Sequence, residues 1–428
     1  MDEKIRRDID NIVWWIPLKK FRNSLRNYLL EINNNINNLN NKIQNITENQ
    51  INYIEKLGYI DTKTINIENQ INYIYKDLKI KLNYISSMEY NYDRNILNNI
   101  KPPYISIIVP IYDIGKEYLV NCLDSLVNQT LKEIEIILVN DCSPNEEDNL
   151  ICEEYASKDN RIKYIKHIEN KGPGGARMTA LREANGYAIA FADPDDTVAL
   201  NAYEIAISRM LINNVDIVSF NFYWIENNEI TDMHINIPQF LYGNNILYSL
   251  STEKIHGPLW DKIYKKELID KFEFDLFIEN NKLDDMIAIV KILSIANSYE
   301  YITVPLYFHN RRSSSITNDI DKKYIFDDRK YLIKNVFEYF NINPLLKSKK
   351  NEMNNYFVYI YKLCYAFIDM VFYKTKQTEE DYKTYISQRG LLKQLIVDNI
   401  KDGYITEEIF LDICNKRNLW YIRDLYYN

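Results

Sequence analysis

The sequence is poor in the features that mark disulfide-rich, zinc-binding and nucleic-acid-binding proteins. Its 428 residues include five cysteines, which form no CxxC pair and no zinc-ligand spacing. We interpret Cys122, Cys142, Cys152, Cys364 and Cys414 as reduced thiols, because a chain of this length does not need disulfide staples. The net charge is −8, which argues against nucleic acid as the main partner because such binding relies on Lys and Arg.

Long apolar runs are also scarce. The first ten residues, MDEKIRRDID, lack the apolar core of a secretory signal, so we expect a cytoplasmic protein. The least polar stretch, 356–373, contains Lys362 and Asp369, which are seven residues apart and therefore near one helix face. Because charges are costly in lipid, this favours a buried or partner-facing helix over a membrane span.

The composition is that of an ordinary globular protein, with 46% hydrophobic and 26% charged residues. A chain of 428 residues exceeds what one hydrophobic core usually organises. Lys101, Pro102 and Pro103 interrupt a helical pattern and mark the entry to a new domain. We therefore predict a helical, coiled-coil-like segment at 1–100, an α/β domain at 101–320 and a helical region at 321–428.

The N-terminal segment carries two patterns. Trp14 and Trp15 lie among seven basic residues, which suits peripheral contact with the inner face of a membrane, although the tryptophans could instead pack against the protein. Residues 32–88 carry an apolar heptad repeat, with Gly58 near its middle. This predicts a homo-oligomer formed through a coiled coil; the alternative is a helix packed on its own catalytic domain.

From Tyr104 onward, apolar runs alternate with amphipathic segments, a pattern typical of parallel strands joined by helices. Ligands of such sheets gather at the carboxyl ends of the strands. The predicted strands are 105–111, 135–139, 162–166 and 187–192, and the predicted helices are 118–129, 149–157 and 175–184.

The strongest chemical signal is the acidic cluster FADPDD at 191–196, directly after a buried strand. Three carboxylates at one place favour a cation, and oxygen ligands suit Mg²⁺ or Mn²⁺. Such an ion also binds phosphate oxygens and neutralises the charge on a departing diphosphate. The alternative is a solvated acidic turn that caps the next helix, where Asp is common.

Six separated motifs occur in an order that resembles the family-2 inverting glycosyltransferases of the GT-A fold, of the kind that build bacterial cell-surface glycans. The resemblance covers roughly residues 104 to 315 and implies an α/β fold with a Rossmann-like mixed sheet. The motifs are ISIIVPIYD (105–113), IILVNDCSPNEEDN (136–149), ENKGPGGARMTAL (169–181), FADPDD (191–196), LDD (283–285) and PLYFHNRRSSSIT (305–317).

The resemblance assigns the nucleotide-sugar donor to residues of the first four motifs. Tyr112 offers a flat ring on which a nucleobase can stack, and Asp141 can accept a hydrogen bond from a base N–H. Arg177, at a helix start, can face phosphate or hold the acidic loop by a bidentate pair. The alternatives are an ordinary strand-end tyrosine and a plain Gly-rich turn. The expected donor-site residues are Pro110, Tyr112, Asp113, Asp141, Gly172, Arg177 and Asp193.

For catalysis, an inverting transfer needs one carboxylate to take the proton of the acceptor hydroxyl. The LDD motif makes Asp285 the candidate base, with Asp284 beside it, although isolated acidic pairs are usually surface residues. Asp195 is expected to bind the metal, and His309 to complete its coordination or touch the diphosphate; a packed histidine is the alternative. Asp196, Trp260 and Asp284 are expected on the acceptor side, with Asp196 orienting the cluster and Trp260 equally suited to the core.

The sequence thus predicts hexosyl or N-acetylhexosaminyl transfer from a nucleotide-sugar, by default a UDP-sugar, to a glycan or lipid-linked acceptor. Three positions depart from the family pattern and leave base and sugar selectivity open: Asp113 and Met178 replace frequent Asn residues, and Asn140 replaces an acidic one. A nucleotidyltransferase would need a Gly- and Lys-rich loop after the first strand, which VPIYDIGKEYL provides poorly. A non-catalytic coiled-coil scaffold is the other alternative.

Overall fold

The computed structural model describes residues 94–226, 229–232, 238–273, 275–279, 283–311, 325–374 and 378–427. These residues all fall within one compact unit, Ser87–Asn428. The heptad repeat at 32–88, Trp14 and Trp15, and residues 312–317 of the last motif lie outside the described residues, so the oligomer and the peripheral membrane contact stay predictions.

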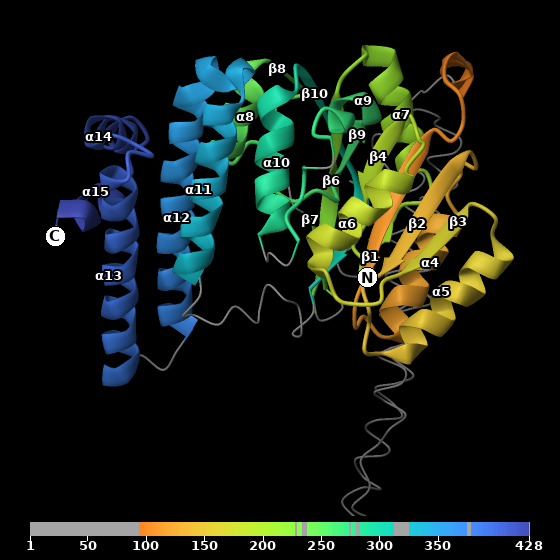
Figure 1. Cartoon of the computed structure of the whole chain (residues 1–428), viewed down its shortest axis with the longest axis horizontal. Coiled ribbons are helices and arrows are strands. Elements are labelled where there is room, and N and C mark those ends of the chain that lie inside the picture. Colours follow the sequence, from red (N-terminus) through yellow and green to blue (C-terminus); the bar gives the residue numbers. More distant parts are fainter. Residues whose placement is uncertain are drawn as a thin grey trace, which may run out of the picture. The chain divides into compact units, whose positions relative to one another are not determined.

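The described strands form one mixed sheet with the order β3-β2-β1-β4-β9-β6-β10-β5, in which β7 also pairs with β6 and β8 with β10 (Figure 1). β1 to β4 pair in parallel, β6 pairs in parallel with β10, and β9 runs antiparallel between β4 and β6. The strands are β1 (Ile105–Ile111), β2 (Ile134–Asn140), β3 (Ile162–Lys166), β4 (Ala188–Phe191), β5 (Thr197–Val198), β6 (Ile217–Glu226), β7 (Glu229–Asp232), β8 (Phe240–Tyr242), β9 (Lys262–Lys265) and β10 (Ser298–Asn310).

Helices connect these strands and then continue alone to the end of the described chain. The predicted mixed α/β fold with C-terminal helices is confirmed. The helices among the strands are η1 (Arg94–Asn99), α4 (Lys116–Val127), α5 (Glu146–Lys158), α6 (Gly172–Glu183), α7 (Ala202–Asn213), α8 (Asn244–Ser251), α9 (Lys266–Asp270) and α10 (Asp284–Ile295). Those after the sheet are α11 (Ile325–Ile342), η2 (Pro344–Lys349), α12 (Lys350–Lys374), α13 (Glu379–Lys401), α14 (Glu407–Lys416) and α15 (Trp420–Tyr427).

β1 is a central strand whose seven residues are all buried. Such a strand is covered on both faces, which explains its nearly continuous Ile and Val content. Pro110 lies near its end, beyond the last β4 pair, Ile108 with Phe191. A residue without an N–H group is therefore tolerated where the ladder on that side has ended.

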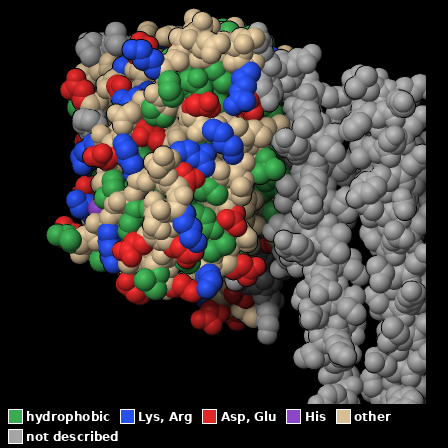
Figure 2. All heavy atoms as spheres, turned by 90° about the vertical axis from the view of Figure 1, so that its right-hand side faces the viewer, with side chains coloured by type: hydrophobic (Ala, Val, Ile, Leu, Met, Phe, Trp, Pro, Cys, Tyr) green, Lys and Arg blue, Asp and Glu red, His purple; other side chains and the backbone are tan. Residues whose placement is uncertain are grey.

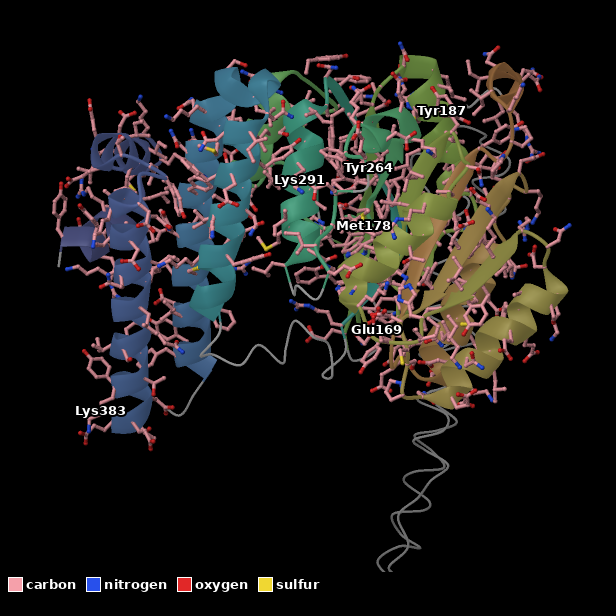
Figure 3. The ribbon with its side chains drawn as sticks, viewed as in Figure 1. Glu169, Met178, Tyr187, Tyr264, Lys291 and Lys383 are labelled. Atoms are coloured by element: carbon pink, nitrogen blue, oxygen red, sulfur yellow. The ribbon has the colours of Figure 1, made fainter. Side chains whose placement is uncertain are left out.

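The carboxyl ends of the parallel strands meet at one edge of the sheet. Figure 3 shows Glu169, in the loop between β3 and α6, in the lower half of the α/β part, and Tyr187, just before β4, near its top. The polar segments that follow β1, β2 and β4 belong to the lower edge. The candidate site residues of the first four motifs are thus brought to one edge by the parallel topology.

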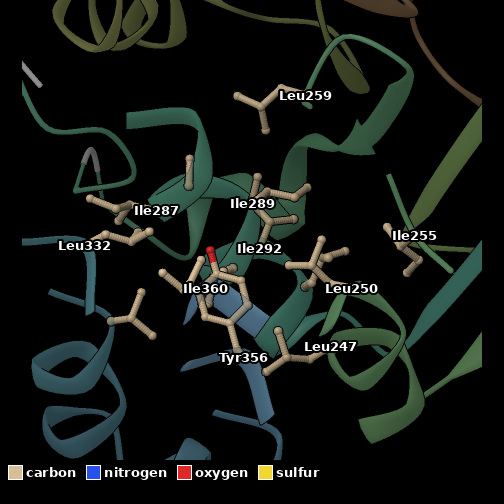
Figure 4. Packing of buried hydrophobic residues seen from close by; sticks show 14 of the residues in the cluster. Leu247, Leu250, Ile255, Leu259, Ile287, Ile289, Ile292, Leu332, Tyr356 and Ile360 are labelled. Carbon is tan, nitrogen blue, oxygen red and sulfur yellow. The ribbon is translucent and has the colours of Figure 1, made fainter. Parts of the chain in front are cut away.

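The C-terminal helices share a hydrophobic core with the α/β part. Tyr356 and Ile360 of α12 pack with Ile292 of α10 and Leu250 of α8 (Figure 4). The two charges of the stretch 356–373 have partners, because Lys362 pairs with Glu253 and Asp369 accepts a hydrogen bond from the Tyr385 hydroxyl at 2.9 Å. α12 is therefore a buried helix. Within the described part of the chain, no helix combines the length and apolarity needed to cross a bilayer.

The cysteine thiols and the distribution of surface charge can be compared with the cysteine spacing and net charge of the sequence. All five cysteines are free, and four of them are buried. On the face shown in Figure 2, acidic and basic side chains are interspersed, and no large area carries one sign of charge.

Candidate active site

The acidic turn 191–196 lies between β4 and β5, and Asp196 is its most enclosed carboxylate. Only 1% of Asp196 is exposed, and burial raises its pKa to about 7 against the opposing effect of His309. Its two oxygens accept from the Asn310 backbone N–H at 2.7 Å and face the His309 Nδ1 at 2.9 Å. Asp196 therefore fixes the end of β10 and the orientation of the imidazole.

His309 is held on two sides. Its Nδ1 faces Asp196, which leaves Nε2 as the ring nitrogen able to meet a metal or a diphosphate. Burial alone would lower the pKa of His309, but the hydrogen bond with Asp196 outweighs it and raises that pKa. The Trp260 ring stacks on both His309 and Tyr307, with centroid distances of 5.0 and 4.5 Å.

Tyr307 connects this aromatic stack to the acidic turn. Its hydroxyl accepts a hydrogen bond from the Asp193 backbone N–H at 3.0 Å. On the next residues of the turn, the backbone carbonyl of Asp195 accepts from the Asn310 side chain at 2.6 Å. Trp260, of which 7% is exposed, thus reaches the turn through Tyr307 and His309.

Arg177 of α6 joins the acidic turn to the LDD motif. Its guanidinium donates to Asp193 at 3.3 Å and to Asp284 at 2.8 Å. Burial by itself would lower the pKa of Arg177, but the carboxylates of Asp284 and Asp193 outweigh it and raise that pKa. Burial raises the pKa of Asp193, and it raises that of Asp284 to about 6, while Arg177 opposes both shifts.

Asp284 and Asp285 form the first turn of α10, a favourable place for negative charge. They are not an ordinary surface pair, since only 2% of Asp284 is exposed and Asp285 is partly buried. Asp285 accepts a hydrogen bond from the Met286 backbone N–H at 2.7 Å. Asp284 therefore anchors the helix start to Arg177, and Asp285 lies beside it.

α6 and α10 approach each other closely at Gly174. A Cβ atom at this position would lie 2.4 Å from the Ile278 carbonyl oxygen and 3.1 Å from the Asp284 Cβ. Gly174 is therefore required where α6 passes close to Ile278, in the segment before α10, and to Asp284, the first residue of α10.

The loop after β1 carries Tyr112 and Asp113. The Tyr112 side chain is 46% exposed, so its ring can receive a ligand. Asp113 has a positive φ of 49°, and its backbone N–H donates to the Ser143 hydroxyl at 3.0 Å. Buried Asp148 accepts from the backbone N–H groups of Ile114 and Gly115 at 3.0 and 3.2 Å. The loops after β1 and β2 are therefore tied together.

Asp141 directly follows β2 and is buried at 2% exposure. Its Oδ1 accepts from the Lys171 backbone N–H at 2.9 Å and lies 2.6 Å from the His167 Nδ1. Gly172 follows with a positive φ of 74° and Pro173 occupies the first turn of α6, which suits a tight helix entry.

The candidate residues therefore form two groups joined by α6. Pro110, Tyr112, Asp113, Asp141 and Gly172 lie around the loops after β1, β2 and β3; Asp193, Asp195, Asp196, Trp260, Asp284, Asp285 and His309 lie around the acidic turn. Arg177 belongs to the second group through its side chain. Asp196, Trp260 and Asp284, expected on the acceptor side, are all buried. Asp196 and Asp284 contact other site residues, whereas Trp260 also packs against Phe222 and His256.

Sequence reasoning missed five supporting residues: Asp148, His167, Thr179, Tyr307 and Asn310. Four of them lie inside the quoted motifs, but none has a spacing that signals a role. A single tyrosine also carries little signal in a chain with 36 tyrosines.

The residues present fit a divalent cation that is shared with a ligand. Within the described ranges, no three His, Cys, Asp or Glu side chains are arranged to hold a metal ion. Mg²⁺, however, commonly takes only one or two carboxylates and completes its coordination with water and substrate phosphates. Asp195 and the His309 Nε2 are the groups that would hold such an ion.

A mixed sheet of this order, with an acidic turn after β4 and a second acidic pair at the start of α10, defines a GT-A type of nucleotide-sugar transferase. Residues 106–271 match the family model described as "Glycosyl transferase family 2". The chain belongs to glycosyltransferase family 2, and it is a glycosyltransferase.

Relatives and solved structures agree with this. "Putative glycosyltransferase EpsH" of Bacillus subtilis is 30% identical over 267 residues, covering 61% of this chain and 76% of that protein. "Uncharacterized glycosyltransferase EpsJ" of the same organism is 31% identical, covering 59% and 74%. The crystal structure of S. aureus TarS 1-349 in complex with UDP-GlcNAc shares the fold with a TM-score of 0.54 at 18% identity, covering 76% of this chain and 88% of that one.

Proposed function

We propose that this glycosyltransferase moves a hexosyl or N-acetylhexosaminyl group from a UDP-sugar to a glycan or lipid-linked acceptor, with inversion at the anomeric carbon. The observation that carries the proposal is the Arg177 bridge between Asp193 and Asp284, at 3.3 and 2.8 Å. Because of this bridge, the two acidic motifs lie in one site, although they are far apart in the sequence.

The donor occupies the group of residues around β1 and β2. The exposed Tyr112 ring stacks on the nucleobase, and Asp141 accepts its ring N–H. Pro110, Asp113 and Gly172 shape the backbone around the nucleoside, and Asp193 lies toward the ribose. A uridine nucleotide is proposed because it presents such an N–H group. The TarS complex with UDP-GlcNAc makes the same donor class a reasonable first choice for the test.

Asp195 and His309 would hold Mn²⁺ or Mg²⁺. When bound, the ion neutralises the negative charge that develops on the departing diphosphate. The protein's own part is to hold these two groups. Asp196 fixes the His309 ring, and Trp260 stacks against its face, so that Nε2 keeps one direction.

Asp285 is the proposed general base. It removes the proton of the acceptor hydroxyl while that oxygen attacks the anomeric carbon from the face opposite the diphosphate. Asp284 keeps the first turn of α10 in place through Arg177, so that Asp285 stands at a fixed position relative to the acidic turn.

The two roles are tested by separate substitutions. Asp195→Asn should abolish the Mn²⁺-dependent part of donor binding, whereas Asp285→Asn should leave donor binding intact and stop transfer. Donor binding is measured by thermal shift over a panel of nucleotide sugars with and without Mn²⁺, because a ligand of the native state raises the melting temperature. Normal turnover by either variant refutes its assigned role, and a retained anomeric configuration refutes the inverting reaction.

The two alternative functions, a nucleotidyltransferase and a non-catalytic scaffold, are distinguished by the products that form. A nucleotidyltransferase would release pyrophosphate from a nucleoside triphosphate and a sugar phosphate. A non-catalytic scaffold would bind the nucleotide sugar without hydrolysing or transferring it in the presence of Mn²⁺. We further propose that 101–320 carries the chemistry, that 1–100 mediates oligomerisation, and that 321–428 covers α10.

A further inference from the structure

Asp141 is the end of a buried chain of hydrogen bonds that the proposed reaction does not itself require. His167 lies between Asp141 and Thr179, with Nδ1 2.6 Å from the Asp141 Oδ1 and Nε2 2.9 Å from the Thr179 hydroxyl. The side chains of His167 and Asp141 are only 7% and 3% exposed. The chain links the end of β2, the loop after β3 and the second turn of α6.

With a neutral His167 ring, the chemistry of these groups fixes the direction of each hydrogen bond. A carboxylate can only accept, so the proton of a neutral His167 ring resides on Nδ1. Nε2 then accepts, and the Thr179 hydroxyl must donate to it. The chain therefore has one arrangement, Thr179 to His167 to Asp141.

The two oxygens of Asp141 are consequently different. Oδ1 accepts twice, from the His167 Nδ1–H and from the Lys171 backbone N–H at 2.9 Å. No described residue donates to Oδ2. With Oδ1 held at two points, the carboxylate cannot rotate freely, and Oδ2 is the acceptor left for a ligand.

We propose that His167, supported by Thr179, positions the Asp141 carboxylate as a fixed acceptor and thereby determines which nucleobase the donor carries. Uracil presents a ring N–H to Oδ2, whereas cytosine presents a bare ring nitrogen at the same place, so two acceptors face each other and cytosine is rejected. The inference rests on the proposed function, in which Asp141 meets the base. His167 is a positioning residue in this scheme.

α6 provides the rigid support for this arrangement. Lys171 stands at its N-terminus and Thr179 lies about two turns further on, so one helix contributes at both ends of the Asp141–His167 pair. Lys171 still donates to Asp141 when His167 is replaced. Such a change therefore alters the orientation of the Asp141 carboxylate while α6 stays beside it.

The test compares the affinities of UDP and CDP in the presence of Mn²⁺, by titration calorimetry on the full chain. In His167→Leu, the ratio of UDP to CDP affinity should fall by about tenfold or more, since a hydrogen bond to a charged group is worth about that factor. His167→Asn keeps an N–H donor for Asp141 and should retain most of the selectivity. Thr179→Val, which keeps the side-chain shape, should show an intermediate loss.

A sharper arm replaces the acceptor itself. In Asp141→Asn, His167 and Lys171 still donate to the Oδ1 position, so the amide nitrogen must occupy the other position and donate. This variant should therefore prefer CDP over UDP, and the preference should disappear in Asp141→Asn combined with His167→Leu. If His167 served only to stabilise the fold, adding His167→Leu would not change the preference of Asp141→Asn for CDP over UDP.

The outcomes separate this inference from the proposed function. If the wild-type chain binds UDP more tightly than CDP and both His167→Leu and Thr179→Val keep that ratio, the inference is overturned while the transferase assignment stands. Equal binding of UDP and CDP by the wild type also overturns it. If the wild type binds neither nucleotide, the proposed uridine donor fails first. Should His167→Leu not fold, Thr179→Val and Asp141→Asn decide the question.

Discussion

Arg177 and Asp284 are 107 residues apart in the sequence and form a buried ion pair with an N–O distance of 2.8 Å. Only about a tenth of the Arg177 side chain and 3% of the Asp284 side chain are exposed. The same guanidinium also reaches Asp193 at 3.3 Å. The relative position of the acidic turn and the start of α10 therefore depends on one side chain.

Replacing Arg177 should affect stability and transfer to different degrees. Arg177→Met leaves two enclosed carboxylates without their cation and should lower the free energy of unfolding by about 3–5 kcal/mol. Arg177→Lys keeps the charge but not the planar fork, so it should fold and lose transfer activity at least tenfold. Urea titrations and initial rates measure the two effects. Arg182→Lys, at an exposed position of the same helix, is the matched control, and equal losses in both lysine variants would contradict the bridge.

Gly174→Ala should displace the backbone next to the start of α10, the helix that carries the proposed general base Asp285. The added Cβ would lie 2.4 Å from the Ile278 carbonyl oxygen, which no side-chain rotation can relieve. We expect lower stability and a large loss of transfer, because the backbone at Ile278, in the segment before α10, must move away from α6. Gly390→Ala is the control, since its Cβ would meet nothing within 4 Å. That variant should be neutral or more stable by about 0.5–1 kcal/mol in a helix interior. Unchanged turnover of Gly174→Ala would show that the contact is not needed.

Glu135 should make the stability of the sheet depend on pH. Burial raises the pKa of Glu135, but hydrogen bonds from Ser106 and Asn185 and the Lys163 ammonium outweigh it and lower that pKa below 4.5. The stabilising contribution is thus complete above the unfolded-state pKa and is lost as the pH falls through the folded-state value. Glu135→Gln should cost about 1–3 kcal/mol at pH 7 and much less near pH 3.

Urea titrations of the wild type and Glu135→Gln across this pH range test the point. A difference in unfolding free energy that stays constant from pH 7 to pH 3 would rule out the ionised carboxylate as its source. Ser106→Ala is a useful companion, because the Ser106 hydroxyl donates to Glu135 at 2.6 Å and its removal should weaken the same pH dependence.

Trp260 should matter for the metal-dependent part of donor binding. Its ring stacks on His309 and Tyr307, so Trp260→Leu releases the imidazole, whereas Trp260→Phe keeps a smaller aromatic face. We expect Mn²⁺ to strengthen UDP binding severalfold less in the leucine variant than in the wild type, with phenylalanine between them. Trp420→Leu, which replaces a tryptophan that is 63% exposed, is the control. If Mn²⁺ strengthens UDP binding equally in the wild type, Trp260→Leu and Trp260→Phe, His309 does not bind the metal.

Much of the first half of the sheet could be predicted from the sequence. Strands at 105–111 and 162–166 have the predicted bounds, because continuous apolar runs flanked by polar turns are unambiguous. The predicted helix starts are two residues late for α4 and three residues late for α5 and α6. α5 begins at Glu146 because the Asn145 side chain accepts from the Glu147 N–H, and α6 begins inside a Gly-Pro-Gly segment that reads as a loop.

The second half was less predictable, because its order in space depends on long-range pairing. β9 enters antiparallel between β4 and β6, and nothing local in KIYK signals this. At the site, residue types and motif order indicated which side chains to consider. The partners of Arg177 and the chain from Thr179 to Asp141 depend on which faces of α6 point toward which elements. A helix that begins with three glycines and a proline has no apolar periodicity there to show this.

α6 gives the enzyme a mechanical link between two tasks. Arg177 on this helix touches the acidic turn and the start of α10, while Lys171 contacts Asp141 and Thr179 contacts His167, the pair proposed to read the base. Packed helices move as rigid bodies. A donor whose base fits poorly and shifts α6 would therefore also displace the acidic turn and the start of α10. Fidelity toward the donor would then appear in the turnover rate as well as in occupancy.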